Sequence, residues 1–234
     1  MRELRRIDFG GYLQAFGLLF RNPSLVLAPF VAALIGVGIA LLAPSGGLLG
    51  GLTGTIAGLV QTLLDSFALS VSLIVADLAW RRRGTVPFAS AWEQARRKAP
   101  DILMATLGFN FILWAAGTVG SVFGLFGVGL ILVALYFFIY TLPAAAIGGI
   151  PGSAAPQISV ERVQRTPAAT FVMLVVIGAV YYGSAMSMLP ILGSLILSGG
   201  LLVLVLNAII KAVGIAFVSL ILAKGYTDAS YGRF

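Results

Sequence analysis

Two charged residues of opposite sign lie deep inside segments that are otherwise apolar. Asp65 falls about ten residues into the segment 55–80, and Lys211 about twelve residues into the segment 199–223, which in helices places them ~15 Å and ~18 Å from an end. A charge near the middle of a bilayer costs at least about 2.5 kcal/mol, so such residues usually have a functional role or a partner. We therefore predict that Asp65 and Lys211 face each other or share a polar cavity.

Other polar and small residues recur around these charges at helical spacing. Gln61 precedes Asp65 by one turn, and Asn207 precedes Lys211 by one turn, so we predict an intramembrane polar site of these four residues. Two interpretations stay open. The site is either a structural ion pair in tight packing, or a relay or binding site for a proton, an ion or a solute. Repeated small residues favour close helix approach, and they include Gly46, Gly50, Gly54 and Gly58.

The residue types leave little room for catalysis. The chain has no histidine and no cysteine, which excludes disulfides, thiolate nucleophiles, the usual zinc sites and Ser-His-Asp chemistry. A Ser–Lys dyad or a Schiff base at Lys211 is conceivable, but no accompanying motif supports either. We predict a non-enzymatic protein with no catalytic residues, metal ion or cofactor.

The elements that must position the four polar residues are membrane helices. The chain is 59% hydrophobic and 10% charged, with a mean hydropathy of +1.04, whereas soluble domains are about 25% charged. A membrane helix needs about 20 apolar residues. We predict an all-α fold, a single membrane domain over residues 1–234 with six transmembrane helices. Their expected ranges are 24–43, 55–80, 101–119, 122–142, 168–189 and 199–223.

The basic residues indicate how these spans are oriented. All but one of the 15 Lys and Arg residues flank the spans on one side, which predicts a cell (plasma or inner) membrane protein with both termini cytoplasmic. The exception is Lys211. The same residues are either topology signals alone or contacts for anionic lipid headgroups. The candidate lipid contacts are Arg21, Arg81, Arg82, Arg83, Arg96, Arg97, Lys98, Arg162 and Arg165.

A short pattern precedes the first, third and fifth spans. A basic residue, a variable residue and then a proline (Pro23, Pro100 and Pro167) lead directly into each apolar segment. Proline is tolerated in the first turn of a helix, and the stretches before it mix apolar and polar residues as interfacial helices do. We predict three repeated hairpins, each preceded by a cytoplasmic interfacial helix. The interfacial helices are expected at 9–21, 87–98 and 155–165, within repeat units of approximately 8–80, 87–142 and 155–224.

Several other polar residues have local interpretations. Asn22 and Thr166 are suited to capping the helices that begin at the prolines after them. Asp77 and Arg81 have the i,i+4 spacing of a helical ion pair. Asn110 is expected to bond a neighbouring membrane helix.

The stretch Tyr140–Ile147 (YTLPAAAI), followed by Ser159–Pro167 (SVERVQRTP), resembles a known family. An apolar-Pro-Ala turn followed by a basic helix and a span is similar to the membrane domain attached to some glycerophosphoryl diester phosphodiesterases, and to its free-standing relatives. The soluble phosphodiesterase domain has no counterpart here, so the resemblance implies an integral membrane protein without that activity. No functional residues carry over.

Together these patterns favour a role that depends on contact rather than chemistry. We expect an accessory, scaffold or membrane-organising subunit that contacts lipids, other membrane proteins or a second copy of itself, and no nucleic acid, because the basic residues are spread along a membrane face. The alternative is a transporter or channel with a polar site at Asp65 and Lys211.

Overall fold

The computed structural model describes residues 9–42, 47–82, 85–186 and 200–231, and every regular element in this part of the chain is a helix. Four helices are long and apolar enough to cross a membrane, and there are up to six if two bent helix pairs each count as a span. The predicted all-α class is therefore confirmed, whereas six spans stay a prediction. The helices are α1 (Phe9–Arg21), α2 (Ser24–Leu42), α3 (Gly47–Arg82), α4 (Phe88–Arg97), α5 (Ala99–Val122), α6 (Leu125–Phe138), α7 (Thr141–Ala146), α8 (Ala155–Arg165), α9 (Pro167–Met186) and α11 (Gly200–Tyr231).

The three short segments predicted before the spans are helices. They correspond to α1, α4 and α8. The chain bends by 74° between α1 and α2, and by 111° between α8 and α9. A residue that precedes proline disfavours helical geometry, which explains why these helices end next to Pro23 and Pro167. The threefold hairpin arrangement itself stays a prediction.

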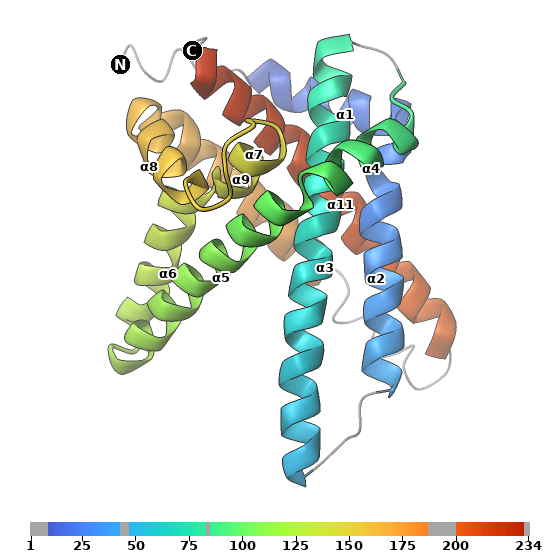
Figure 1. Cartoon of the computed structure of the whole chain (residues 1–234), viewed down its shortest axis with the longest axis vertical. Helices are drawn as coiled ribbons and strands as arrows, with labels where there is room; N and C mark the ends of the chain where they lie inside the picture. Colours follow the sequence, from blue (N-terminus) through green and yellow to red (C-terminus); the bar gives the residue numbers. More distant parts are fainter. Residues whose placement is uncertain (1–8, 43–46, 83–84, 187–199, 232–234) are drawn as a thin grey trace.

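The short helices gather at one end of the molecule. Figure 1 shows α1, α4 and α8 there, together with the C-terminal ends of α3 and α11. The start of α3 and the turn between α5 and α6 lie at the opposite end. The ends of α1, α3, α4 and α8 carry basic residues. Positive charge is thus concentrated at the end that holds the short helices.

The best-packed part of the molecule lies around α11, which contacts α2, α3, α9 and α1. From Val71 to Ala76, the residues of α3 are at most 2% exposed, and Ala212, Ala216 and Leu220 of α11 are fully buried. Alanine and serine are frequent in this region, and small residues allow membrane helices to approach closely. This packing holds α3 and α11 in a fixed relation, so the polar residues that they carry have defined partners.

The fourth predicted span is continued through α6 and α7, with a short irregularity in the helix between Phe138 and Thr141. The proline ring of Pro143 clashes with the carbonyl group four residues earlier, at Ile139, and proline also lacks an N–H group. Ser159 of α8 satisfies both sides of this irregularity: its Oγ donates to Phe137 O at 2.8 Å and accepts from Tyr140 N at 3.0 Å. Insertion of a side chain into a helical ladder is a recognised cause of such an irregularity.

The hairpin of α5 and α6 leans away from α2 and α3 (Figure 1). Its two helices cross where Gly120 and Gly127 meet backbone to backbone, and a Cβ atom on either residue would collide with the other. Only 17% of the most apolar part of α5 is buried. The hairpin therefore presents an open apolar surface, which includes Met104, Leu107, Phe111, Trp114 and Val119.

Candidate functional site

The structure brings Asp65 and Lys211 into direct contact. The Nζ atom of Lys211 lies 2.7 Å from Oδ2 of Asp65. Gln61 donates from Nε2 to the other carboxylate oxygen of Asp65 at 2.8 Å, and its Nε2 also lies 3.4 Å from the carbonyl oxygen of Ala32 in α2. We call Gln61, Asp65 and Lys211 the mid-helix cluster. The contact predicted between the two charges is present, and each carboxylate oxygen has a donor.

The remaining predicted member, Asn207, does not join this cluster. It lies one turn before Lys211 on α11 with an exposed side chain, and no hydrogen bond links it to Gln61, Asp65 or Lys211. Gly36 of α2 has a role that the sequence pattern did not reveal, because the Gln61 side chain lies directly over it and occupies the place of a Cβ atom. A larger residue there would displace Gln61 from Asp65.

The mid-helix cluster is partly exposed, and a fully packed stretch of α3 begins close to it. The side chains of Lys211 and Asp65 are 42% and 29% exposed. Toward the end that holds the short helices, the buried stretch Val71–Ala76 of α3 begins within two turns of Asp65.

The glycine repeat before Asp65 does not mediate close packing where the structure describes it. A Cβ atom at Gly54 or Gly58 would meet nothing within 4 Å, and both residues are exposed. Gly46 lies outside the described residues, and the side-chain surroundings of Gly50 are not described. The prediction of close approach along this stripe is thus wrong for Gly54 and Gly58.

A second polar cluster on α3 and α11 was missed in the sequence. Lys224 Nζ lies 2.8 Å from Oδ2 of Asp228, one turn later on α11, and 5.5 Å from the ring centre of Trp80 at the end of α3. The indole Nε1 of Trp80 donates to Leu220 O at 3.0 Å. We call Trp80, Lys224 and Asp228 the helix-end cluster. The i,i+4 spacing of Lys224 and Asp228 was a visible signal for the pair, but nothing local indicates that Trp80 lies beside it.

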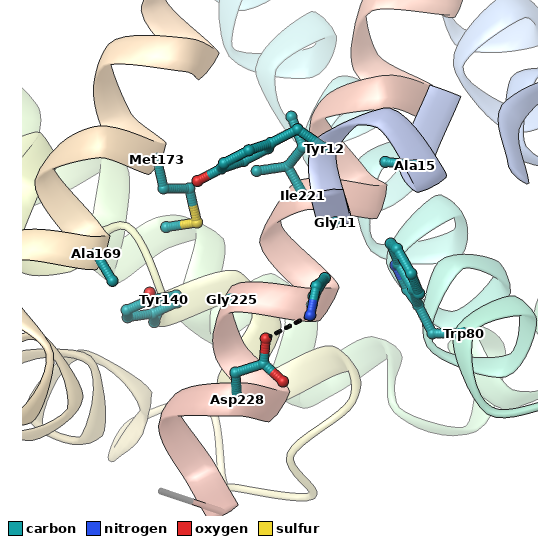
Figure 2. Close-up of a pocket in the computed structure, with 11 residues that line it drawn as sticks. Gly11, Tyr12, Ala15, Trp80, Tyr140, Ala169, Met173, Ile221, Gly225 and Asp228 are labelled. Carbon is teal, nitrogen blue, oxygen red and sulfur yellow. Dashed lines mark hydrogen bonds and ion pairs between the residues drawn. The ribbon is translucent and has the colours of Figure 1, made fainter. Parts of the chain in front are cut away.

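The helix-end cluster forms part of the wall of a cavity of about 40 Å³, which is room for a few water molecules. Figure 2 shows residues from α1, α3, α9 and α11 around it. The buried hydroxyl of Tyr140 lies 3.2 Å from that of Thr170. Gly225 allows α11 to pack closely against Met173 of α9, since a Cβ atom at residue 225 would lie 2.7 Å from Sδ of Met173. The lining residues are Gly11, Tyr12, Ala15, Trp80, Tyr140, Ala169, Met173, Ile221, Lys224, Gly225 and Asp228.

The predicted lipid-contact residues fall into two groups. In the first group the charged atoms are engaged within the protein. Lys98 donates to Ala146 O at 2.8 Å, where it caps α7, and the guanidinium of Arg162 lies over the ring of Tyr226 and bonds Ser230. Arg81 and Arg97 pair with Asp77 and Glu93, which confirms the predicted Asp77–Arg81 pair. The second group comprises the exposed residues Arg21, Arg82, Arg96 and Arg165. Arg81 and Arg97 are exposed too, with side chains 56% and 78% exposed, but are held in ion pairs, and Arg83 lies outside the described residues.

Two predicted helix caps act on the preceding helix instead. Asn22 donates from Nδ2 to Leu18 O of α1, and its Oδ1 accepts from the backbone N–H of Val86 at 3.0 Å. Thr166 donates to Arg162 O of α8. Both side chains thus donate to carbonyl oxygens at the end of the preceding helix rather than capping the start of the next helix. The expectation for Asn110 is also wrong, because its amide bonds Thr106 O in its own helix.

Among the described residues, no group of acidic side chains is arranged to hold a metal ion. No family model, no curated protein and no solved structure matches this chain. The resemblance to the phosphodiesterase-associated membrane domain therefore stays a prediction. The two polar clusters and the surface around them are the basis for a functional proposal.

Proposed function

We propose that this chain is a non-enzymatic integral membrane protein that acts by contacting lipids and other membrane proteins, as an accessory or scaffold subunit. The two-sided surface of α1 carries the proposal. Ala15 and Leu19 are buried against the bundle, whereas Leu13, Phe16 and Phe20 are 79%, 54% and 74% exposed. A helix with a second, open apolar stripe is suited to the boundary between headgroups and acyl chains.

The charge at this end of the molecule complements such a position. Arg21 follows the exposed stripe of α1, and exposed arginines also end α3, α4 and α8. Each basic residue near an anionic membrane surface contributes about 1 kcal/mol of attraction. The open apolar surface of α5 and α6 gives a further area for lipid chains or partner helices.

The lipid contact can be tested on the four exposed arginines. In the proposal, replacing Arg21, Arg82, Arg96 and Arg165 by glutamine weakens binding of phosphatidylglycerol at least tenfold, as measured by native mass spectrometry from mixed-lipid nanodiscs. The matched control replaces the same residues by lysine, which preserves the charge and should preserve binding. Equal phosphatidylglycerol binding by the glutamine and lysine variants would contradict the proposal.

The proposed orientation places the short helices in the cytoplasm, and the absence of cysteine makes this simple to test. Ser90 lies in α4 and Ser121 near the end of α5. With Ser121→Cys, a membrane-impermeant thiol reagent should label intact cells, and with Ser90→Cys it should label only inverted vesicles. The reverse pattern would overturn the orientation.

One observation favours the alternative of a transporter or channel. The mid-helix cluster is a charge pair inside an apolar helix bundle, yet it is partly exposed rather than sealed. Intramembrane charges often mark ion or proton pathways. Liposomes that take up protons or small ions in a manner abolished by Asp65→Asn would establish this function. Absence of flux across a panel of monovalent ions and protons would favour the structural role.

A further inference from the structure

The cavity in Figure 2 combines features that recognise an ammonium group. Asp228 supplies a carboxylate, and Trp80, Tyr12 and Tyr140 supply aromatic rings from three different elements. Cations bind over aromatic faces, most strongly over tryptophan. In the structure, the ammonium group of Lys224 lies beside these groups, paired with Asp228 and near the ring of Trp80.

The pair is accessible to exchange because it is local and incompletely buried. The side chains of Lys224 and Asp228 are 26% and 21% exposed. Both belong to one helix, so a change of partner does not require separation of helices. A ligand that carries one positive and one negative group could replace the internal pair with two new pairs and leave no charge unmatched.

The position of the cavity indicates the source of such a ligand. Gly11, Tyr12 and Ala15 of α1 form one of its walls. The other face of the same helix carries the exposed stripe of Leu13 and Phe16, which is proposed to meet the headgroup boundary. The cavity therefore lies just beneath a helix at the membrane surface, within reach of phospholipid headgroups.

We infer that this cavity binds the phosphoethanolamine headgroup of a membrane phospholipid. The ligand ammonium takes the place of the Lys224 ammonium beside Asp228 and Trp80, and the Lys224 side chain turns to the ligand phosphate. A primary ammonium donates hydrogen bonds to a carboxylate, whereas a trimethylammonium group is larger and donates none. The site should thus select phosphatidylethanolamine over phosphatidylcholine. This inference rests on the proposed lipid contact of α1.

The test uses Trp80 as a reporter. The chain has three tryptophans, and Trp92 and Trp114 are 45% and 66% exposed, so replacing both by phenylalanine leaves Trp80 alone. In phosphatidylcholine nanodiscs, added phosphatidylethanolamine should change Trp80 emission saturably, and phosphatidylglycerol should not. Asp228→Asn should raise the half-saturating lipid fraction about tenfold, and Asp228→Glu should restore it.

The matched control is Glu93→Gln, which removes the acid of another i,i+4 pair that lies on the exposed surface of α4. It should leave the response unchanged. An equal response to phosphatidylcholine, or a normal response in Asp228→Asn, would overturn the inference. Soluble O-phosphoethanolamine, added at the same concentration as phosphatidylethanolamine, should compete poorly with the lipid for the Trp80 response. Full competition would show that the cavity binds the free metabolite and would overturn the lipid assignment. Phosphatidylglycerol binding by the arginine variants tests the proposed lipid contact, and Trp80 emission tests the cavity. A negative result in one experiment therefore does not imply a negative result in the other.

Discussion

The two polar clusters occupy the same pair of helices but are built differently. In the mid-helix cluster, Asp65 and Lys211 come from α3 and α11 and are 146 residues apart in sequence. In the helix-end cluster, Lys224 and Asp228 lie one turn apart on α11. The first pair therefore joins two helices, whereas both members of the second ion pair belong to α11, so a change of partner there does not require two helices to separate. The stability of the fold should depend on the first cluster and ligand recognition on the second.

The largest effect is expected when one charge of the mid-helix cluster is removed. Lys211→Met leaves the Asp65 carboxylate without its counter-ion, which should lower the free energy of unfolding by about 2 kcal/mol after allowance for the partial exposure of the pair. Asp65→Asn should have a similar effect. Reversible unfolding in mixed micelles measures both.

The double variant Asp65→Asn/Lys211→Met makes this prediction specific. If the contact stabilises the fold, the double variant should be more stable than the sum of the single effects by about 1 kcal/mol. Additive effects would show that the two charges act independently. The mid-helix cluster would then not stabilise the fold through its ion pair, which contradicts the difference proposed between the two clusters.

A smaller effect is expected from Gln61→Leu, which keeps the approximate volume of the side chain over Gly36. It removes the hydrogen bond to Asp65, so the free energy of unfolding should fall by about 1 kcal/mol. In the Asp65→Asn background the loss should be smaller, because a neutral acceptor binds the amide less strongly. If Gln61→Leu lowers the free energy of unfolding equally in the Asp65→Asn background, Gln61 does not stabilise the fold through Asp65.

At the helix end, Trp80→Phe should lower the free energy of unfolding by about 1 kcal/mol through loss of the hydrogen bond from Nε1 to Leu220 O. This bond joins α3 to α11, so it is the one element of the helix-end cluster expected to affect stability. Trp114→Phe, at an exposed position on α5, is the matched control and should have little effect. Equal losses in the two variants would contradict the assignment.

The smallest effect is expected from Lys224→Gln. A local, partly exposed i,i+4 pair contributes about 0.3–0.5 kcal/mol, so stability should change little while the phosphatidylethanolamine response of Trp80 weakens. Arg97→Gln, from the corresponding pair on α4, should change neither. A loss of stability comparable to that of Lys211→Met would remove the distinction between the clusters.

Much of the fold could be predicted from patterns that are local in sequence. The prolines at 23 and 167 mark bends in the structure, and α1, α4 and α8 lie where mixed polarity precedes an apolar segment. The contact of Asp65 with Lys211 was also predictable, because two isolated opposite charges in apolar helices have few other ways to be compensated.

The remaining features depend on tertiary packing that a single sequence does not encode locally. Gly54 and Gly58 have the spacing of a packing motif but face open space, while close approaches occur at glycines outside that motif, such as Gly36, Gly120 and Gly127. Asn22 has the residue type of a helix cap, yet its acceptor bonds Val86, which is 64 residues away. Trp80 could be placed beside Lys224 only once the pairing of α3 with α11 was known.

The contact between Asp65 and Lys211 also has a consequence for biosynthesis. Lys211 is synthesised 146 residues after Asp65, so at about 5–20 residues per second roughly 7–30 s separate the two residues on the ribosome. During this interval the carboxylate of Asp65 lacks the counter-ion that it has in the folded protein. The ion pair between α3 and α11 can therefore form only after Lys211 has been synthesised, so this part of the packing cannot guide the earlier insertion of α3.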